Sequence, residues 1–90
     1  VFYGRMQRKE AEMALLLYQR DDCHLCDQAL AVLAAASTPE FDSVFIDEDV
    51  QLEARYGVLV PVLRDDARDV ELHWPFDVQQ VQDFLQANAA

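Results

Sequence analysis

The chain divides into short apolar runs and amphipathic stretches, which polar residues separate from one another. Residues 14–19 are a continuous apolar run, typical of a strand that is buried on both faces. Residues 23–36 place apolar side chains at i, i+3, i+4 and i+7, as a helix does when one face packs on a core. Asp21 and Asp22 are the expected caps at the start of this helix, and Pro39 stops it.

The middle of the chain predicts a second strand and a short helix. Residues 41–46 have strand composition, and the acidic residues 47–49 follow them. Negative charge is favourable at the positive end of a helix dipole, so we expect a helix over residues 49–56. Gly57 should end this helix in the left-handed conformation, which glycine adopts most readily.

The last third of the chain predicts a hairpin and a final helix. Residues 58–63 have strand composition around Pro61, and after a polar turn residues 70–74 alternate with a period of two. Asp77 precedes the last apolar stripe and has Gln80 three residues later, which is the arrangement of a capping box.

The predicted order is therefore strand, helix, strand, helix, strand, strand, helix. A parallel β-α-β unit followed by a β-β-α unit gives an α/β fold with a four-stranded mixed sheet and helices on both faces. We assign residues 13–90 to this domain. Residues 1–12 fit none of its elements, and we expect them to form an N-terminal extension outside the core.

The composition favours one globular domain: the chain has 90 residues, of which 52% are hydrophobic. Its two cysteines are too few for a disulfide-stapled secreted scaffold. The apolar run over residues 13–18 is too short for a signal peptide or a membrane span. We expect a cytoplasmic protein, in which a Cys-x-x-Cys pair is more often catalytic or metal-binding than structural.

The charge is strongly negative and unevenly distributed. The formal net charge is −10, and residues 13–90 alone carry −11 because residues 1–12 contribute +1. Such a field disfavours nucleic acid, whose binding depends on phosphate neutralisation by Lys and Arg, and it equally disfavours anionic membrane surfaces. It permits a basic protein partner.

Both cysteines of the chain lie in the sequence Cys-His-Leu-Cys at residues 23–26. At i and i+3 on a first helical turn they share one face, where a disulfide closes without much backbone movement. The unpaired N–H groups of that turn and the helix dipole favour a thiolate at Cys23, the nucleophilic form in disulfide exchange. Protonated His24 would favour it further and Arg20 would offset some negative charge, whereas the two preceding aspartates oppose it.

This dithiol and Val60-Pro61, about 35 residues later, together resemble the thioredoxin fold in its glutaredoxin-like form (βαβαββα), and in particular small bacterial glutaredoxin-like proteins of undefined function. The resemblance implies a thiol–disulfide oxidoreductase that reduces protein or glutathione mixed disulfides. Cys23 would be the nucleophile and Cys26, on the apolar stripe, the resolving cysteine. Pro61 would be a cis-proline, and the backbone of Val60 would pair with the substrate. His24 would modulate the dithiol.

The chain also departs from the familiar glutaredoxins. They carry Pro-Tyr or a close variant between the cysteines, where this chain has His24-Leu25. Many also have a glycine pair and an aspartate before the last helix, which hold glutathione; here the stretch is Trp74-Pro75-Phe76-Asp77. Only Asp77 can take that role, and Arg20 is the other weak candidate for substrate contact. Glutathione is therefore a possible reductant and no cofactor is required.

The alternative is a thioredoxin-fold module that binds a metal or a partner through the same turn without turnover. Cys23, His24, Cys26 and Asp27 are all possible ligands, and copper chaperones also place Cys-x-x-Cys between a first strand and helix. Their later elements follow a different order, and a closed zinc site wants four ligands, with only His73 left to add. We therefore assign no metal site. We interpret the acidic residues Asp47-Glu48-Asp49 as the start of a helix and not as a cation site. We expect Trp74 and Phe76 to pack in the core and not to line a substrate groove.

Overall fold

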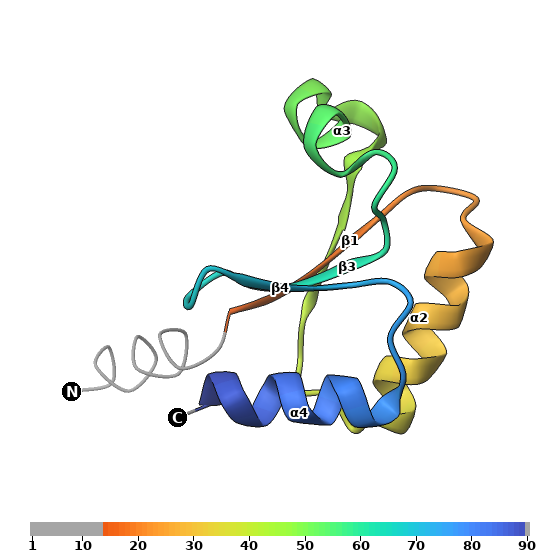
Figure 1. The fold of residues 1–90 in the computed structure, drawn as a ribbon. Helices are drawn as coiled ribbons and strands as arrows, with labels where there is room; N and C mark the ends of the chain where they lie inside the picture. The colour runs from red at the N-terminus through yellow and green to blue at the C-terminus, as the bar shows by residue number, and fades with distance from the viewer. Residues whose placement is uncertain (1–13, 90) are drawn as a thin grey trace.

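The computed structural model describes residues 14–89, which form a four-stranded sheet with helices on both faces (Figure 1). Residues 1–12, for which an extension was expected, lie outside the described residues. The strand order is β2-β1-β3-β4. Strand β1 is parallel to β2 and antiparallel to β3, and β3 is antiparallel to β4. The predicted α/β fold with a mixed sheet is confirmed. The strands are β1 (Leu15–Gln19), β2 (Asp42–Phe45), β3 (Val62–Asp65) and β4 (Val70–His73).

The helices enclose the sheet unequally. Two long helices, α2 (His24–Ala35) and α4 (Val78–Ala89), lie on one face, whereas the short η1 (Ile46–Glu48) and α3 (Val50–Tyr56) lie on the other (Figure 1). Adjacent residues of β1 point to opposite faces, so Leu17 joins the core under α2 and α4 while Tyr18 joins the core under α3. This explains why the β1 sequence is apolar at nearly every position.

The core beneath α2 and α4 is the larger of the two. Leu17 is fully buried there, so its replacement by alanine should cost about 2–5 kcal/mol. The predicted stripes of both long helices face this core. Its buried residues are Leu17, Ala29, Leu33, Ala36, Leu63, Phe76 and Val81.

The loop before β3 differs from the sequence prediction. The strand begins at Val62, directly after Pro61, whereas residues 57–59 form a turn. Proline has no N–H to donate to a ladder, so it marks the start of this strand and cannot lie in its middle. Gly57 is right-handed, with φ −52° and ψ −39°, so the expected left-handed cap is wrong.

Candidate active site

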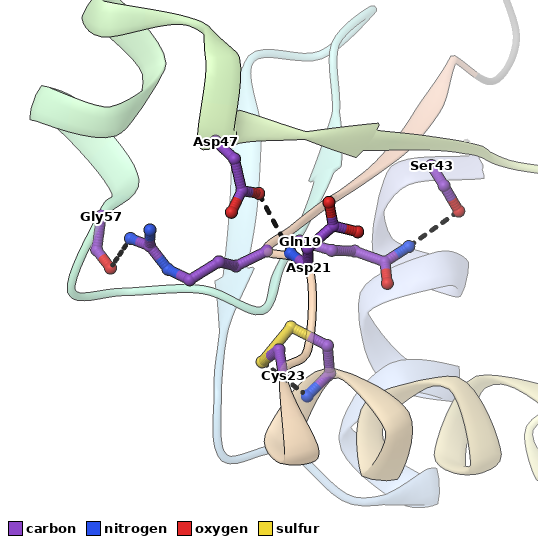
Figure 2. The surroundings of a disulfide bond; sticks show 8 residues. Gln19, Asp21, Cys23, Ser43, Asp47 and Gly57 are labelled. Atoms are coloured by element: carbon purple, nitrogen blue, oxygen red, sulfur yellow. Dashed lines mark hydrogen bonds between the residues drawn. A yellow bond between two sulfur atoms is a disulfide. The ribbon is translucent and has the colours of Figure 1, made fainter.

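The two cysteines lie at the start of α2 and are joined by a disulfide, with Cα atoms 5.2 Å apart. Cys23 is the N-cap residue, in an extended conformation, and Cys26 lies in the first helical turn. The backbone N–H of Cys26 donates to Sγ of Cys23 at 3.1 Å (Figure 2). A sulfur thus takes the place that a serine or aspartate oxygen usually occupies. The prediction that Asp21 or Asp22 caps this helix is wrong.

The two cysteines differ in their exposure to solvent. Cys23 is half-buried, whereas Cys26 is only 1% exposed and belongs to the buried core residues. The difference follows from helix geometry, because the N-cap residue projects beyond the helix while the residue three positions later turns toward the sheet. A reagent arriving from solvent therefore meets Cys23 first.

The loop between β1 and the disulfide is held by η1. The backbone N–H of Asp21 donates to Oδ1 of Asp47 at 3.0 Å (Figure 2). Asp22, the next residue, has a left-handed φ of 54°, which aspartate tolerates better than most residues. At the end of β1, Nε2 of the buried Gln19 donates to Oγ of Ser43 on β2 at 2.8 Å. These bonds fix the chain just ahead of Cys23.

Arg20 connects the same loop to the end of α3. Its guanidinium donates to both carboxylate oxygens of Glu53, at 2.9 and 2.5 Å. It also donates to the backbone oxygen of Gly57 at 2.7 Å (Figure 2). The hydrogen bonds to Glu53 are the main reason that the pKa of Arg20 lies above its ordinary value. As a candidate substrate contact, Arg20 is thus found already engaged by its own chain.

Gly57 is required here because of close approach. A Cβ atom at this position would lie 2.5 Å from the backbone oxygen of Glu53 and 2.5 Å from its Oε1. Such a separation is far shorter than the van der Waals contact distance between a carbon and an oxygen atom. The backbone angles themselves suit any residue.

Val60 and Pro61 lie beside this loop. The Val60–Pro61 peptide bond is cis. In the β1–β3 register Tyr18 pairs with Val62, so continuing it by one position sets Pro61 across from Gln19. The side chain of Pro61 is buried, and Val60 packs on the core under α3. Val60 and Pro61, the predicted substrate contacts, therefore lie at the same end of the sheet as the end of β1. From there the chain leads to Cys23.

The segment before α4 has a structural role in this conformation. Oδ1 of Asp77 accepts from the N–H of Gln80 at 2.8 Å, and Oε1 of Gln80 accepts from the N–H of Asp77 at 2.9 Å. The predicted capping box is confirmed, and the carboxylate of Asp77 is used by the helix. Phe76 is buried and meets the Trp74 ring edge-on at 5.0 Å, as expected of core aromatics.

The possible metal ligands are not gathered together. Among residues 14–89, no three His, Cys, Asp or Glu side chains are grouped so as to hold a metal ion. His24 is exposed and its Nε2 lies 3.0 Å from Nε2 of Gln28. Nε2 of His73, on β4, lies 3.0 Å from Oε1 of Glu71.

Sequence reasoning missed two groups of residues. Asp47 anchors the loop ahead of Cys23, and its position directly after a strand parallel to β1 was the available signal. Glu71 is the centre of a polar network under α3: it accepts from Arg64 at 3.0 Å and from the Tyr56 hydroxyl. Burial first, and then the hydrogen bond to Glu71, raises the pKa of Tyr56 to about 12.

Over the described residues, no helix combines the length and the apolar character needed to cross a membrane. A four-stranded mixed sheet with a cysteine pair at the start of its first described helix defines a small thioredoxin-like domain.

The sequence over residues 14–86 matches the family model of the glutaredoxin-like domain (DUF836), and the chain belongs to this family. It is similar to protein XcR50 from X. campestris in two solved structures. The chain in the crystal structure has 58% sequence identity to this one, and the match covers 82% of this chain and 97% of that chain with a TM-score of 0.78. The solution structure is 59% identical, covering 83% and 95%, with a TM-score of 0.78.

Protein Ne2328 from Nitrosomonas europaea is also similar, with 30% identity over 80% of this chain and 89% of that one and a TM-score of 0.68. A comparison with curated proteins gave no match.

Proposed function

We propose that this protein is a thiol–disulfide oxidoreductase, with Cys23 as the nucleophile and Cys26 as the resolving cysteine. The observation that carries the proposal is the asymmetry of the disulfide: Cys23 is half-buried at the helix N-cap, whereas Cys26 is 1% exposed. A catalytic dithiol needs one accessible sulfur to attack the substrate and one protected sulfur to complete the exchange.

In the reduced protein, the Cys23 thiolate attacks one sulfur of a substrate disulfide. A bond forms between Cys23 and that sulfur, the substrate S–S bond breaks, and the other substrate sulfur leaves as a thiolate. The Cys26 thiolate then attacks Cys23, which forms the intramolecular disulfide and releases the second substrate thiolate. Two electrons pass to the substrate, and the two protons of the dithiol end on the released thiols.

Two features of the helix start support a thiolate at Cys23. The N–H of Cys26 already donates to the Cys23 sulfur, and the positive end of the α2 dipole lies at the same place. His24, exposed and next in sequence, is the proposed modulator of the dithiol, because a protonated imidazole there favours the thiolate.

The substrate side is proposed to lie at Val60–Pro61, which flanks the loop ahead of Cys23. Arg20 and Asp77 have other roles in this conformation, holding α3 and capping α4. The exchange needs no cofactor, only a thiol reductant to restore the dithiol, and glutathione belongs to that chemical class. A reducing, cytoplasmic setting would keep such a dithiol in turnover.

The test is a redox titration of the purified full chain in thiol–disulfide buffers, followed by alkylation and mass measurement. We expect a reversible two-electron couple between about −300 and −100 mV, together with turnover of the uncharged 2-hydroxyethyl disulfide. Stoichiometric binding of zinc or copper(I) without turnover would instead support a binding module that uses the same turn.

A further inference from the structure

Large aliphatic side chains are exposed between the two cysteines and in the loop between α3 and β3. Leu25, between the two cysteines, is 45% exposed. Val58 and Leu59, in the loop between α3 and β3, are 97% and 39% exposed. The bond from Arg20 to Gly57 holds this second loop beside the chain that leads to Cys23, and Figures 1 and 2 show the two loops next to each other. We call Leu25, Val58 and Leu59 the apolar rim.

The surface around the apolar rim is negative. Residues 20–27 and 46–53 contain seven acidic side chains and one arginine, a net charge of −6 with histidine neutral. That arginine, Arg20, is held by Glu53. The exposed carboxylates of these segments that form no ion pair with any residue among 14–89 are those of Asp21, Asp22, Asp27, Asp47, Glu48 and Asp49.

We infer that the substrate of the dithiol, if the proposed function holds, is a disulfide in a basic polypeptide, with Lys or Arg flanking the cysteine and an apolar side chain next to it. The apolar side chain would cover the rim, which a small disulfide leaves in water. The cations would meet the unpaired carboxylates, and such steering raises association rates by about 10- to 1,000-fold. Oxidised glutathione carries net negative charge and is repelled by the same field.

The test compares two synthetic peptide disulfides of one sequence, flanked either by two lysines or by two glutamates, as substrates of the reduced full chain. The uncharged 2-hydroxyethyl disulfide is the reference. At low ionic strength we expect kcat/KM for the lysine peptide to exceed that for the glutamate peptide by about tenfold or more. The ratio should shrink at about 0.5 M salt, because the Debye length becomes shorter than the spacing of the charges.

A triple variant, Asp22→Asn/Asp27→Asn/Glu48→Gln, removes three of these unpaired carboxylates and keeps Asp47 and Asp49, which accept backbone hydrogen bonds. It should lower the lysine-to-glutamate ratio at least about threefold, and the ratio cancels any change in thiolate reactivity. Asp83→Asn on α4 is the matched control and should leave the ratio unchanged. For the rim, Val58→Ser should raise KM for both peptides but not for the 2-hydroxyethyl disulfide. Val50→Ser, at an exposed valine on α3 outside the rim, should leave all three KM values unchanged.

Failure of the two proposals would look different. If neither the 2-hydroxyethyl disulfide nor either peptide is reduced, the proposed function is wrong. If any of these disulfides is reduced but the two peptides react equally, or oxidised glutathione reacts faster than the lysine peptide, the dithiol is active and the basic-polypeptide inference is overturned.

Discussion

The guanidinium of Arg20 donates a hydrogen bond of 2.7 Å to the backbone oxygen of Gly57, although the two residues are 37 positions apart. This bond joins the end of β1 to the end of α3. The chain continues from one partner to Cys23 and from the other to Pro61. The Cys23 side and the Pro61 side of the candidate site are therefore held together by a hydrogen bond between two residues that lie outside the site.

Gly57→Ala should destabilise the protein. Alanine would normally be favoured at right-handed angles, but its Cβ would lie 2.5 Å from the backbone oxygen of Glu53. We expect a loss of about 1–2 kcal/mol in the free energy of unfolding, measured by urea titration. Gln51→Ala, on the exposed side of α3, is the control and should change stability little. A stabilised Gly57→Ala variant would show that the contact relaxes freely.

Asp47 is expected to position the loop ahead of Cys23. Asp47→Asn and Asp47→Ala both remove the charge, but only Asn keeps an oxygen that can accept from the N–H of Asp21. We expect Asp47→Ala to slow exchange with 2-hydroxyethyl disulfide by about tenfold, an effect of about 1.4 kcal/mol, and Asp47→Asn to slow it much less. Equal rates in the two variants would mean that the hydrogen bond to Asp21 does not matter for exchange and that Asp47 acts only through its charge.

The two cysteines should behave differently when one is replaced. Cys26→Ser should accumulate a stable mixed disulfide at Cys23, because the resolving sulfur is gone, whereas Cys23→Ser should not react with substrate. Intact mass after incubation with an excess of a peptide disulfide distinguishes the two. Trapping in the Cys23→Ser variant would reverse the assigned roles.

The polar network under α3 should make stability depend on acid pH. Burial opposes charge on Glu71, but hydrogen bonds from Tyr56, His73 and Arg64 outweigh it and set the pKa of Glu71 below its ordinary value. A lowered pKa in the folded state means that the stabilisation is complete above the unfolded pKa of about 4.3 and is lost as the pH falls through the folded value.

Glu71→Gln should therefore cost about 1–3 kcal/mol at pH 7, with the difference from the parent narrowing below pH of about 4. Urea titrations of both proteins from neutral to acid pH measure it. Glu40→Gln, an exposed carboxylate outside the network, should leave the pH profile unchanged. A difference that stays constant with pH would rule out charge as the source.

Much of the fold followed from local pattern. The apolar run of β1, the stripes of α2 and α4, the alternation of β4 and the capping box at Asp77 each depend on residues a few positions apart. Hydrophobic period and cap chemistry report such local preferences directly. The start of β3 was predicted too early, at residue 58, although the missing N–H of Pro61 was a local sign that the strand begins after it.

The sequence by itself determined the order of the elements and the place of the dithiol at a helix start, because periodicity and residue spacing encode both. Only the tertiary structure decided that the Cys23 sulfur caps its own helix, that Gly57 is needed for the space which Glu53 fills, and that Asp47 holds the loop before the disulfide. The Asp47 contact depends on how η1 packs beside the end of β1, and the Glu53 carboxylate is held against Gly57 by Arg20, which is distant in sequence. Contacts of Arg20 with residues 33 and 37 positions away leave no periodic trace in the chain.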